Sequence, residues 1–198
     1  MPAADAELVK LNKIYTRTGD GGSAGLVDGS RVSKAGPRMA AIGEVDEANS
    51  AIGVAISALE AGSALAVRLR QVQNEMFDLG ADIATPFGSE FEPHALRIVA
   101  RQVERIEEEI DAMNADLAPL TSFILPGGSN AVAQLHLARA IVRRAERAVV
   151  ALAEVEEVNP QASAYINRLS DHLFVAARAH AAGEGGDVLW QPGATRDA

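Results

Sequence analysis

The 198-residue sequence predicts an all-α fold. Apolar residues recur at intervals of three and four along five long segments, which is the spacing of one buried face of an α-helix. No segment shows a convincing alternation of apolar and polar residues, so no β-strand is predicted. Aromatic residues make up only 4% of the chain, and its Ala-rich faces suit close packing of helices. We therefore expect a five-helix bundle with a Gly-rich N-terminal arm.

The first two helices are expected over residues 37–61 and 65–83. The second helix has an apolar face with alternating spacings of four and three: Leu65, Leu69, Val72, Met76, Leu79 and Ile83. The run Thr85-Pro86-Phe87-Gly88 then ends this helix, because proline and glycine interrupt helical structure.

The third helix is expected over residues 96–113, before Pro119. Its apolar face is Leu96, Val99, Val103, Ile106, Ile110 and Met113. The run Pro126-Gly127-Gly128-Ser129 leads into a fourth helix with the apolar stripe Leu135, Ala138, Val142, Ala145, Val149 and Leu152. The fifth helix begins near Asn159-Pro160, since proline suits a first helical turn. Its apolar face is Ile166, Leu169, Leu173, Ala176 and His180.

Short polar rows lie beside the apolar stripes of three helices. The row of the fourth helix is His136, Arg139, Arg143 and Glu146. The corresponding rows are Asn167, Asp171, Phe174 and Arg178 in the fifth helix and Asp46, Asn49 and Gly53 in the first. Such rows are either a solvated charged face or polar groups at a core edge that need partners or a ligand. His136 is equally a satisfied core-edge histidine or an orienter of such a site.

The N-terminal arm, residues 13–34, is rich in glycine and hydroxyl groups and is locally basic, ending in Arg31 and Lys34. Its central run is Thr16, Arg17, Thr18, Gly19, Asp20, Gly21 and Gly22. This is not a Walker A motif, because no Gly-Lys-Ser/Thr follows the glycines. The arm is either a plain cluster of turns or a loop whose backbone N–H groups bind phosphate oxygens.

Composition narrows the class of protein. A hydrophobic content of 48% in 198 residues suffices for one domain core, so we expect residues 1–198 to form a single domain. The net charge of −9 argues against a nucleic-acid or anionic-membrane partner. There is no cysteine, and residues 1–12 resemble no leader and are expected to be flexible. No segment has the roughly 18 apolar residues that span a bilayer, so we expect a cytoplasmic protein.

Several kinds of chemistry are disfavoured by the residues present. None of the four histidines follows a glutamate by three positions, as di-iron bundles require. No Ser/His/Asp signature stands out, and cysteine is absent, so nucleophilic catalysis by the protein is not expected. Cations, amides and glycines remain, which suit a reaction in which the substrates supply the chemistry and the protein supplies positioning and charge stabilisation.

An ordered set of motifs resembles the PduO-type ATP:cob(I)alamin adenosyltransferases, from about residue 13 to residue 193. The motifs are Thr16-Arg17-Thr18-Gly19-Asp20-Gly21-Gly22, Arg31-Val32-Ser33-Lys34, Val45-Asp46-Glu47-Ala48-Asn49-Ser50, Phe123-Ile124-Leu125-Pro126-Gly127-Gly128, Arg143-Arg144-Ala145-Glu146-Arg147, Asn167-Arg168-Leu169-Ser170-Asp171 and Trp190-Gln191-Pro192-Gly193. Two departures are Ser23-Ala24 in place of a hydroxyl pair and Ala48 in place of Leu.

The resemblance implies a homotrimer that binds ATP in the cleft between neighbouring subunits. The nucleotide-binding residues would be the run Thr16 to Gly22 with Lys34 at the γ-phosphate end, and Arg139, Arg143, Glu146 and Asn167. Asp46 and Arg139 would form a supporting ion pair. Mg²⁺, Arg143 and Lys34 would stabilise the leaving triphosphate, although the ligands of Mg²⁺ are not identified. Possible protein partners are a corrinoid reductase or an adenosylcobalamin-dependent acceptor enzyme.

The implied reaction transfers the 5′-deoxyadenosyl group of ATP to the cobalt of a reduced corrinoid such as cobalamin. Cobalt(I) is itself the nucleophile, so no general base is needed. Phe123 matches a family aromatic residue on the corrinoid side, where an apolar wall would keep the lower axial ligand away; from the residues alone, a phenylalanine is a core residue more often. The alternative function is a non-catalytic nucleotide- or corrinoid-binding helical bundle.

Overall fold

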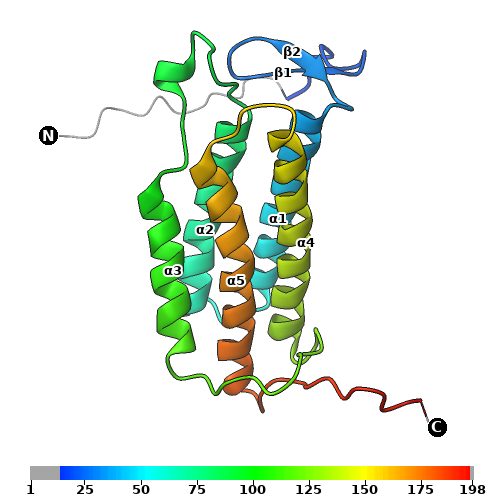
Figure 1. Ribbon diagram of the computed structural model, residues 1–198, viewed down its shortest axis with the longest axis vertical. Helices are drawn as coiled ribbons and strands as arrows, with labels where there is room; N and C mark the ends of the chain where they lie inside the picture. The colour runs from blue at the N-terminus through cyan, green and yellow to red at the C-terminus, as the bar shows by residue number, and fades with distance from the viewer. Residues whose placement is uncertain (1–13, 197–198) are drawn as a thin grey trace, which may run out of the picture.

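Five α-helices run side by side along one axis in the computed structural model, which describes residues 14–196 (Figure 1). The helices are α1 (Pro37–Ser57), α2 (Ala64–Ile83), α3 (Ala100–Asn114), α4 (Asn130–Ala153) and α5 (Pro160–Ala182), with a 3₁₀ turn at Glu92–His94. The five-helix prediction is confirmed. The expectation that residues 1–12 are flexible lies outside the described residues.

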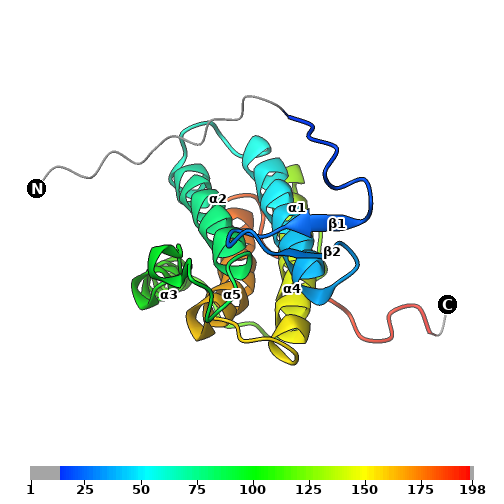
Figure 2. The same cartoon turned by 90° about the horizontal axis from the view of Figure 1, so that it is seen from above.

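Neighbouring helices pack in the order α2, α1, α4, α5, α3, and a smaller contact between α2 and α5 closes four of them around a core (Figure 2). Large side chains from these four helices are fully buried there, among them Ile52, Leu79, Leu135 and Leu169. α3 stands outside this group against α5. No helix in residues 14–196 is long and apolar enough to cross a membrane.

Side-chain caps mark the first residues of α4 and α5. Ser129 caps α4 by accepting a hydrogen bond from the backbone N–H of Val132 (3.4 Å). Asn159 caps α5 by accepting from the N–H of Gln161 (3.0 Å), and Pro160 occupies the first helical turn as expected. These caps satisfy N–H groups that have no partner inside the helix.

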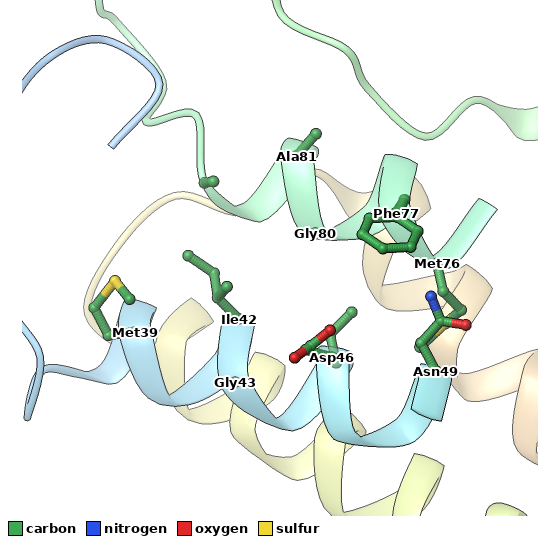
Figure 3. Close-up of a pocket in the computed structure, with 11 residues that line it drawn as sticks. Met39, Ile42, Gly43, Asp46, Asn49, Met76, Phe77, Gly80 and Ala81 are labelled. Atoms are coloured by element: carbon green, nitrogen blue, oxygen red, sulfur yellow. The ribbon is translucent and has the colours of Figure 1, made fainter. Parts of the chain in front are cut away.

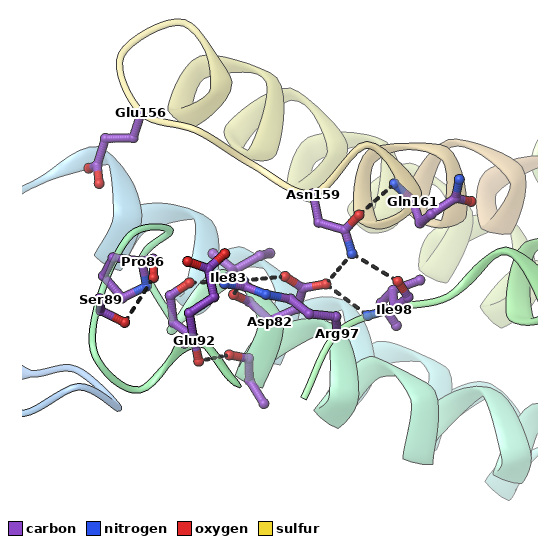
Figure 4. A network of polar contacts seen from close by, with 12 residues as sticks. Asp82, Ile83, Pro86, Ser89, Glu92, Arg97, Ile98, Glu156, Asn159 and Gln161 are labelled. Atoms are coloured by element: carbon purple, nitrogen blue, oxygen red, sulfur yellow. Dashed lines mark hydrogen bonds and ion pairs between the residues drawn. The ribbon is translucent and has the colours of Figure 1, made fainter. Parts of the chain in front are cut away.

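Two helix boundaries differ from the sequence prediction. α1 ends at Ser57 rather than near residue 61, and α3 begins at Ala100 rather than at residue 96. Asp82 explains the second difference: its carboxylate accepts hydrogen bonds from the backbone N–H of Ile98 (2.8 Å) and from the side chains of Arg97 (2.8 Å) and Asn159 (2.6 Å) (Figure 4). This junction holds residues 97–98 outside a helix and joins the end of α2 to the start of α5.

A short hairpin is the main departure from the all-helical prediction. β1 (Ser23–Gly25) pairs antiparallel with β2 (Arg31–Ser33), with Ala24 opposite Val32. Three residues are too few for alternation to be recognised in a sequence. The hairpin belongs to the N-terminal arm and crosses the ends of α1 and α2 (Figure 2), where the N–H of Val27 donates to the carbonyl of Ala84 (3.3 Å).

Charged side chains also tie the helices together. Arg38, buried at the start of α1, bonds the carbonyl of Ile83 and pairs with Glu156 (2.6 Å). Between α2, α3 and α5, Tyr165 donates to Glu75 (2.7 Å), which also pairs with Arg105. These contacts join elements that are far apart in the sequence.

Candidate functional site

A cleft of about 620 Å³ lies between α4, α5, the segment that precedes α4 and the segment that follows α5. Its lining residues are Leu120, Thr121, Ser122, Phe123, Ile124, Arg139, Phe174, Trp190 and Pro192. We call this the α4–α5 cleft. It combines three aromatic side chains with one arginine, so it can accept a large apolar ligand that has a polar edge.

Phe123 projects from this cleft rather than packing in the core, since it is 77% exposed. Its ring is tilted against Trp190, with centroids 6.0 Å apart. The C-terminal segment holds this pair in place, because the N–H of Trp190 donates to the carbonyl of Phe123 (2.8 Å) and the Ser122 hydroxyl donates to the carbonyl of Trp190 (2.7 Å). The interpretation of Phe123 as a core residue is therefore wrong.

Arg139 and His136 lie on α4, and both side chains are close to the ring of Phe174, which lines the cleft. The Arg139 guanidinium lies 5.7 Å from the ring centroid, and the His136 ring lies 6.3 Å from it. Nε of Arg139 and both ring nitrogens of His136 are buried without a hydrogen-bond partner among the described residues. Burial and then the charge of Arg139 lower the pKa of His136, against an opposing effect of Asp187. His136 is therefore a buried, neutral core-edge residue beside the site.

The rest of the predicted row continues along α4. Glu146 accepts a hydrogen bond from Nδ2 of Asn167 on α5 (2.7 Å), and Arg168 donates to Oδ1 of the same asparagine (2.6 Å). Arg143 is exposed one turn away, and its side chain has no hydrogen bond or ion pair within the described range. Burial and the charge of Arg143 lower the pKa of Arg139. Arg139, Arg143, Glu146 and Asn167 thus lie along one seam between α4 and α5, as the helical spacing predicted.

The N-terminal arm forms a tight loop against Lys34. The N–H of Lys34 donates to the carbonyl of Gly22 (2.9 Å), and a Cβ added to Gly19 would lie 2.9 Å from the Lys34 Nζ atom. The backbone N–H groups of Gly19 and Gly21 take part in none of the hydrogen bonds within residues 14–196. Free N–H groups and an ammonium group in one loop are features of an anion site.

Other residues of the run define the shape of this loop. The hydroxyls of Thr16 and Thr18 are hydrogen-bonded to each other (2.8 Å), and Arg17 has a left-handed backbone with φ of 62°. The N–H of Asp20 donates to the carbonyl of Arg17 (3.3 Å). These hydrogen bonds and the left-handed backbone of Arg17 give the loop one defined conformation.

Asp46 lies in a second groove, between α1 and α2 (Figure 3). This α1–α2 groove of about 430 Å³ is lined mainly by apolar residues, including Met39, Ile42, Met76 and Phe77. Asp46 is exposed there, and the described residues give it no hydrogen bond or ion pair. The predicted partner Arg139 faces the α4–α5 cleft instead, so the pair is not made inside one chain.

The predicted site residues therefore fall into two groups. Figure 1 shows the arm at one end of the bundle and the loop into α4, together with the C-terminal segment, at the other. Lys34 and Asp46 belong with the arm and the α1–α2 groove, whereas Phe123 and Arg139 belong with the α4–α5 cleft. Trp190 and Phe174 were not assigned a role from the sequence. The only available signals were their places in a motif and in a polar row.

Comparison with known proteins adds independent findings. The family model described as cobalamin adenosyltransferase matches residues 14–180. A corrinoid adenosyltransferase of Mycobacterium tuberculosis (strain H37Rv) is 47% identical over 192 residues, covering 96% of this chain and 98% of the relative. A corrinoid adenosyltransferase of Bacillus subtilis is 43% identical, covering 90% and 92%.

Solved structures give the same result. A variant PduO-type ATP:corrinoid adenosyltransferase from Lactobacillus reuteri, complexed with cobalamin and ATP, superposes with a TM-score of 0.85 at 38% identity, covering 91% of this chain and 97% of the other. A further variant of that protein, complexed with ATP, gives a TM-score of 0.82 at 38% identity, covering 90% and 100%.

Proposed function

This chain belongs to the cobalamin adenosyltransferase family and transfers the 5′-deoxyadenosyl group of ATP to the cobalt of a reduced corrinoid, and we propose that its two groups of site residues meet between copies of a homotrimer. The observation that supports this arrangement is their separation within one chain. Asp46 and the arm lie on the α1–α2 side, and Arg139 and Phe123 lie in the α4–α5 cleft.

The α1–α2 groove has the character of a contact surface between copies. Phe77 is 72% exposed at its edge, and Asp46 has no partner among the described residues. Arg139 has an unpartnered Nε atom on the other side of the molecule. A neighbouring copy that brings the aspartate to the arginine would give both charges a partner and cover the apolar groove.

In the reaction, cobalt(I) attacks the 5′ carbon of ATP, a cobalt–carbon bond forms, and the bond from that carbon to the triphosphate oxygen breaks. We propose that Arg143 and Lys34 stabilise the triphosphate charge while the run Thr16 to Gly22 surrounds its γ-phosphate end. Glu146 and Asn167, joined by their hydrogen bond, would orient the nucleoside. No residue is required to act as a general base.

Phe123 and Trp190 would form an apolar wall on the corrinoid side of the reacting cobalt. Both rings are partly exposed in the cleft, and their backbones are hydrogen-bonded to each other. Such a wall excludes water and the base of the nucleotide loop from the lower face of cobalt. Cobalt(II) without a lower ligand is easier to reduce to the nucleophilic cobalt(I) state.

We propose that Mg²⁺ binds at this site mainly through the phosphates of ATP. No group of three His, Asp or Glu side chains in residues 14–196 is arranged to hold a metal ion. Mg²⁺ commonly binds through substrate phosphates with few protein ligands.

The proposal includes a cytoplasmic location and a separate reductase that supplies the electron.

The direct test is incubation of the purified protein with ATP and chemically reduced cobalamin. The absorbance spectrum should change to that of adenosylcobalamin, and triphosphate should be released in equal amount. A protein that binds ATP or corrinoid without this change would be the non-catalytic binding module. Sedimentation tests the trimer, and removal of divalent ions by EDTA should slow the transfer.

A further inference from the structure

Arg31 makes an unusual set of contacts for an exposed side chain. Its Nη2 atom donates to the carbonyl of Thr18 (2.6 Å), the carbonyl of Ser23 (3.1 Å) and the hydroxyl of Ser23 (2.8 Å). Its Nε atom donates to the same hydroxyl (3.2 Å). One guanidinium thus joins the two residues that flank the glycine run of the arm.

The hairpin brings Arg31 to this position. Arg31 on β2 pairs with Gly25 on β1, and Ser23 lies two residues along β1 on the same face of the ribbon. The arginine side chain lies across Gly25 toward Ser23, and a Cβ added to Gly25 would be in ordinary van der Waals contact with Nη1 (4.0 Å). The planar fork of arginine suits several carbonyl and hydroxyl acceptors at once.

These contacts have a consequence for anion binding. Carbonyl oxygens repel phosphate, and the Arg31 guanidinium offsets the negative charge of the Thr18 and Ser23 oxygens by donating hydrogen bonds to both. The Ser23 oxygen lies beside Gly19, 3.4 Å from the position of an added Cβ. The N–H groups of Gly19 and Gly21 remain without partners in the described residues, and Gly19 lies next to the Lys34 ammonium group. The loop also includes a left-handed arginine, Arg17, a conformation that needs support from its surroundings.

We infer that Arg31 is a positioning residue for the triphosphate of ATP, and that the Ser23 hydroxyl is its acceptor rather than a phosphate ligand. This inference rests on the proposed function. Arg31 acts through the loop: its guanidinium preorganises residues 18–23, so ATP need not order them on binding. The departure at Ser23-Ala24 is consistent with this role, since the one remaining hydroxyl is already used by Arg31.

The test compares the Michaelis constants of Arg31→Gln, Arg31→Lys, Ser23→Ala and the double variant. Arg31→Gln should raise KM for ATP by about ten- to thirtyfold, the range expected for losing hydrogen bonds from a charged group. The KM for corrinoid and the melting temperature should stay unchanged, and kcat at saturating ATP should fall less than about twofold because bound ATP reorders the loop. Amide hydrogen exchange at residues 18–23 should become faster in the free variant.

Arg31→Lys separates positioning from simple charge. Lysine keeps the positive charge but cannot reproduce the fork, so its KM for ATP should resemble that of Arg31→Gln. Ser23→Ala should raise KM by about threefold on its own and should add nothing in the Arg31→Gln background. Arg101→Gln is the matched control, because Arg101 on α3 is an exposed arginine hydrogen-bonded to Glu108 (2.7 and 3.0 Å) away from the arm.

Three results would overturn the inference. They are an unchanged KM for ATP in Arg31→Gln, wild-type behaviour of Arg31→Lys, or additive effects of the serine and arginine changes. Each of these leaves the proposed function standing if the wild-type protein makes adenosylcobalamin. Failure of the wild-type protein to do so contradicts the proposed function itself.

Discussion

Asp46 and Arg139 face different grooves of the same chain, one between α1 and α2 and the other between α4 and α5, and no ion pair joins them in residues 14–196. A supporting ion pair between them therefore requires two copies. Asp46→Asn and Arg139→Ala should each impair transfer, since each change leaves a charge unpartnered in the assembly. The double variant should lose less than the product of the two single effects.

Mixed oligomers give this prediction a sharper form. When the two impaired single variants are mixed and allowed to exchange subunits, some interfaces combine an intact Asp46 with an intact Arg139. Activity should then recover partly, and it should not recover when either variant is incubated alone. No recovery in confirmed mixed oligomers, together with additive single effects, would mean that the two residues do not interact.

Arg143 tests the assignment of the triphosphate site. Its exposed side chain has no partner within the described range, so Arg143→Ala should leave the melting temperature nearly unchanged. Loss of a charge-assisted contact of about 1.5–3 kcal/mol should weaken ATP binding or slow transfer by about ten- to a hundredfold. ATP titration, steady-state kinetics and a thermal melt measure the three quantities. Normal turnover with a greatly lowered melting temperature would make Arg143 a structural residue.

Phe123 distinguishes an apolar wall from a core side chain. A core Phe→Ala change costs about 3–5 kcal/mol of stability, but Phe123 is 77% exposed, so Phe123→Ala should cost far less. ATP binding should stay normal, while cobalt(II)alamin should keep its lower ligand and become harder to reduce. Electron paramagnetic resonance of cobalt(II)alamin with the variant and ATP checks this. A normal four-coordinate cobalt signal would remove Phe123 from the mechanism.

His136 predicts a pH dependence of stability. Burial and the charge of Arg139 lower its pKa in the folded protein, so the unfolded chain binds a proton more readily below the ordinary pKa of about 6.5. Its contribution is therefore fully present above that pH and is lost as the pH falls toward the folded pKa. His136→Gln does not titrate, so its deficit relative to wild type should shrink between pH 7.5 and 5.5. Urea unfolding at both pH values measures this, and a constant deficit would contradict it.

Tyr165 is a core residue and not one of the proposed site residues. It is fully buried on α5, and its hydroxyl donates to Glu75 on α2 (2.7 Å). Tyr165→Phe should lower the free energy of unfolding by about 1–3 kcal/mol and leave both Michaelis constants unchanged. Chemical denaturation and kinetics on the same preparation test the separation. A changed KM for ATP at unchanged stability would show that this contact acts on the site.

The sequence by itself determined the helices and the order of their polar rows, because helical spacing and caps are local properties. α2 begins at Ala64 and ends at Ile83, within one residue of the prediction, and Ser129 and Pro160 mark the starts of two more helices. The seam that includes Glu146 and Asn167 followed from the same spacing.

Only the tertiary structure decided the features that depend on contacts between distant residues. Asp82 delays the start of α3 by bonding Ile98, sixteen positions away, and Trp190 holds Phe123 in the open cleft across 67 positions. The division of the site into an arm with Asp46 and a cleft with Arg139 also depends on how the helices pack. Spacing along one helix specifies which residues share a face, but the neighbour of that face is set by packing and hydrogen bonds between separate elements.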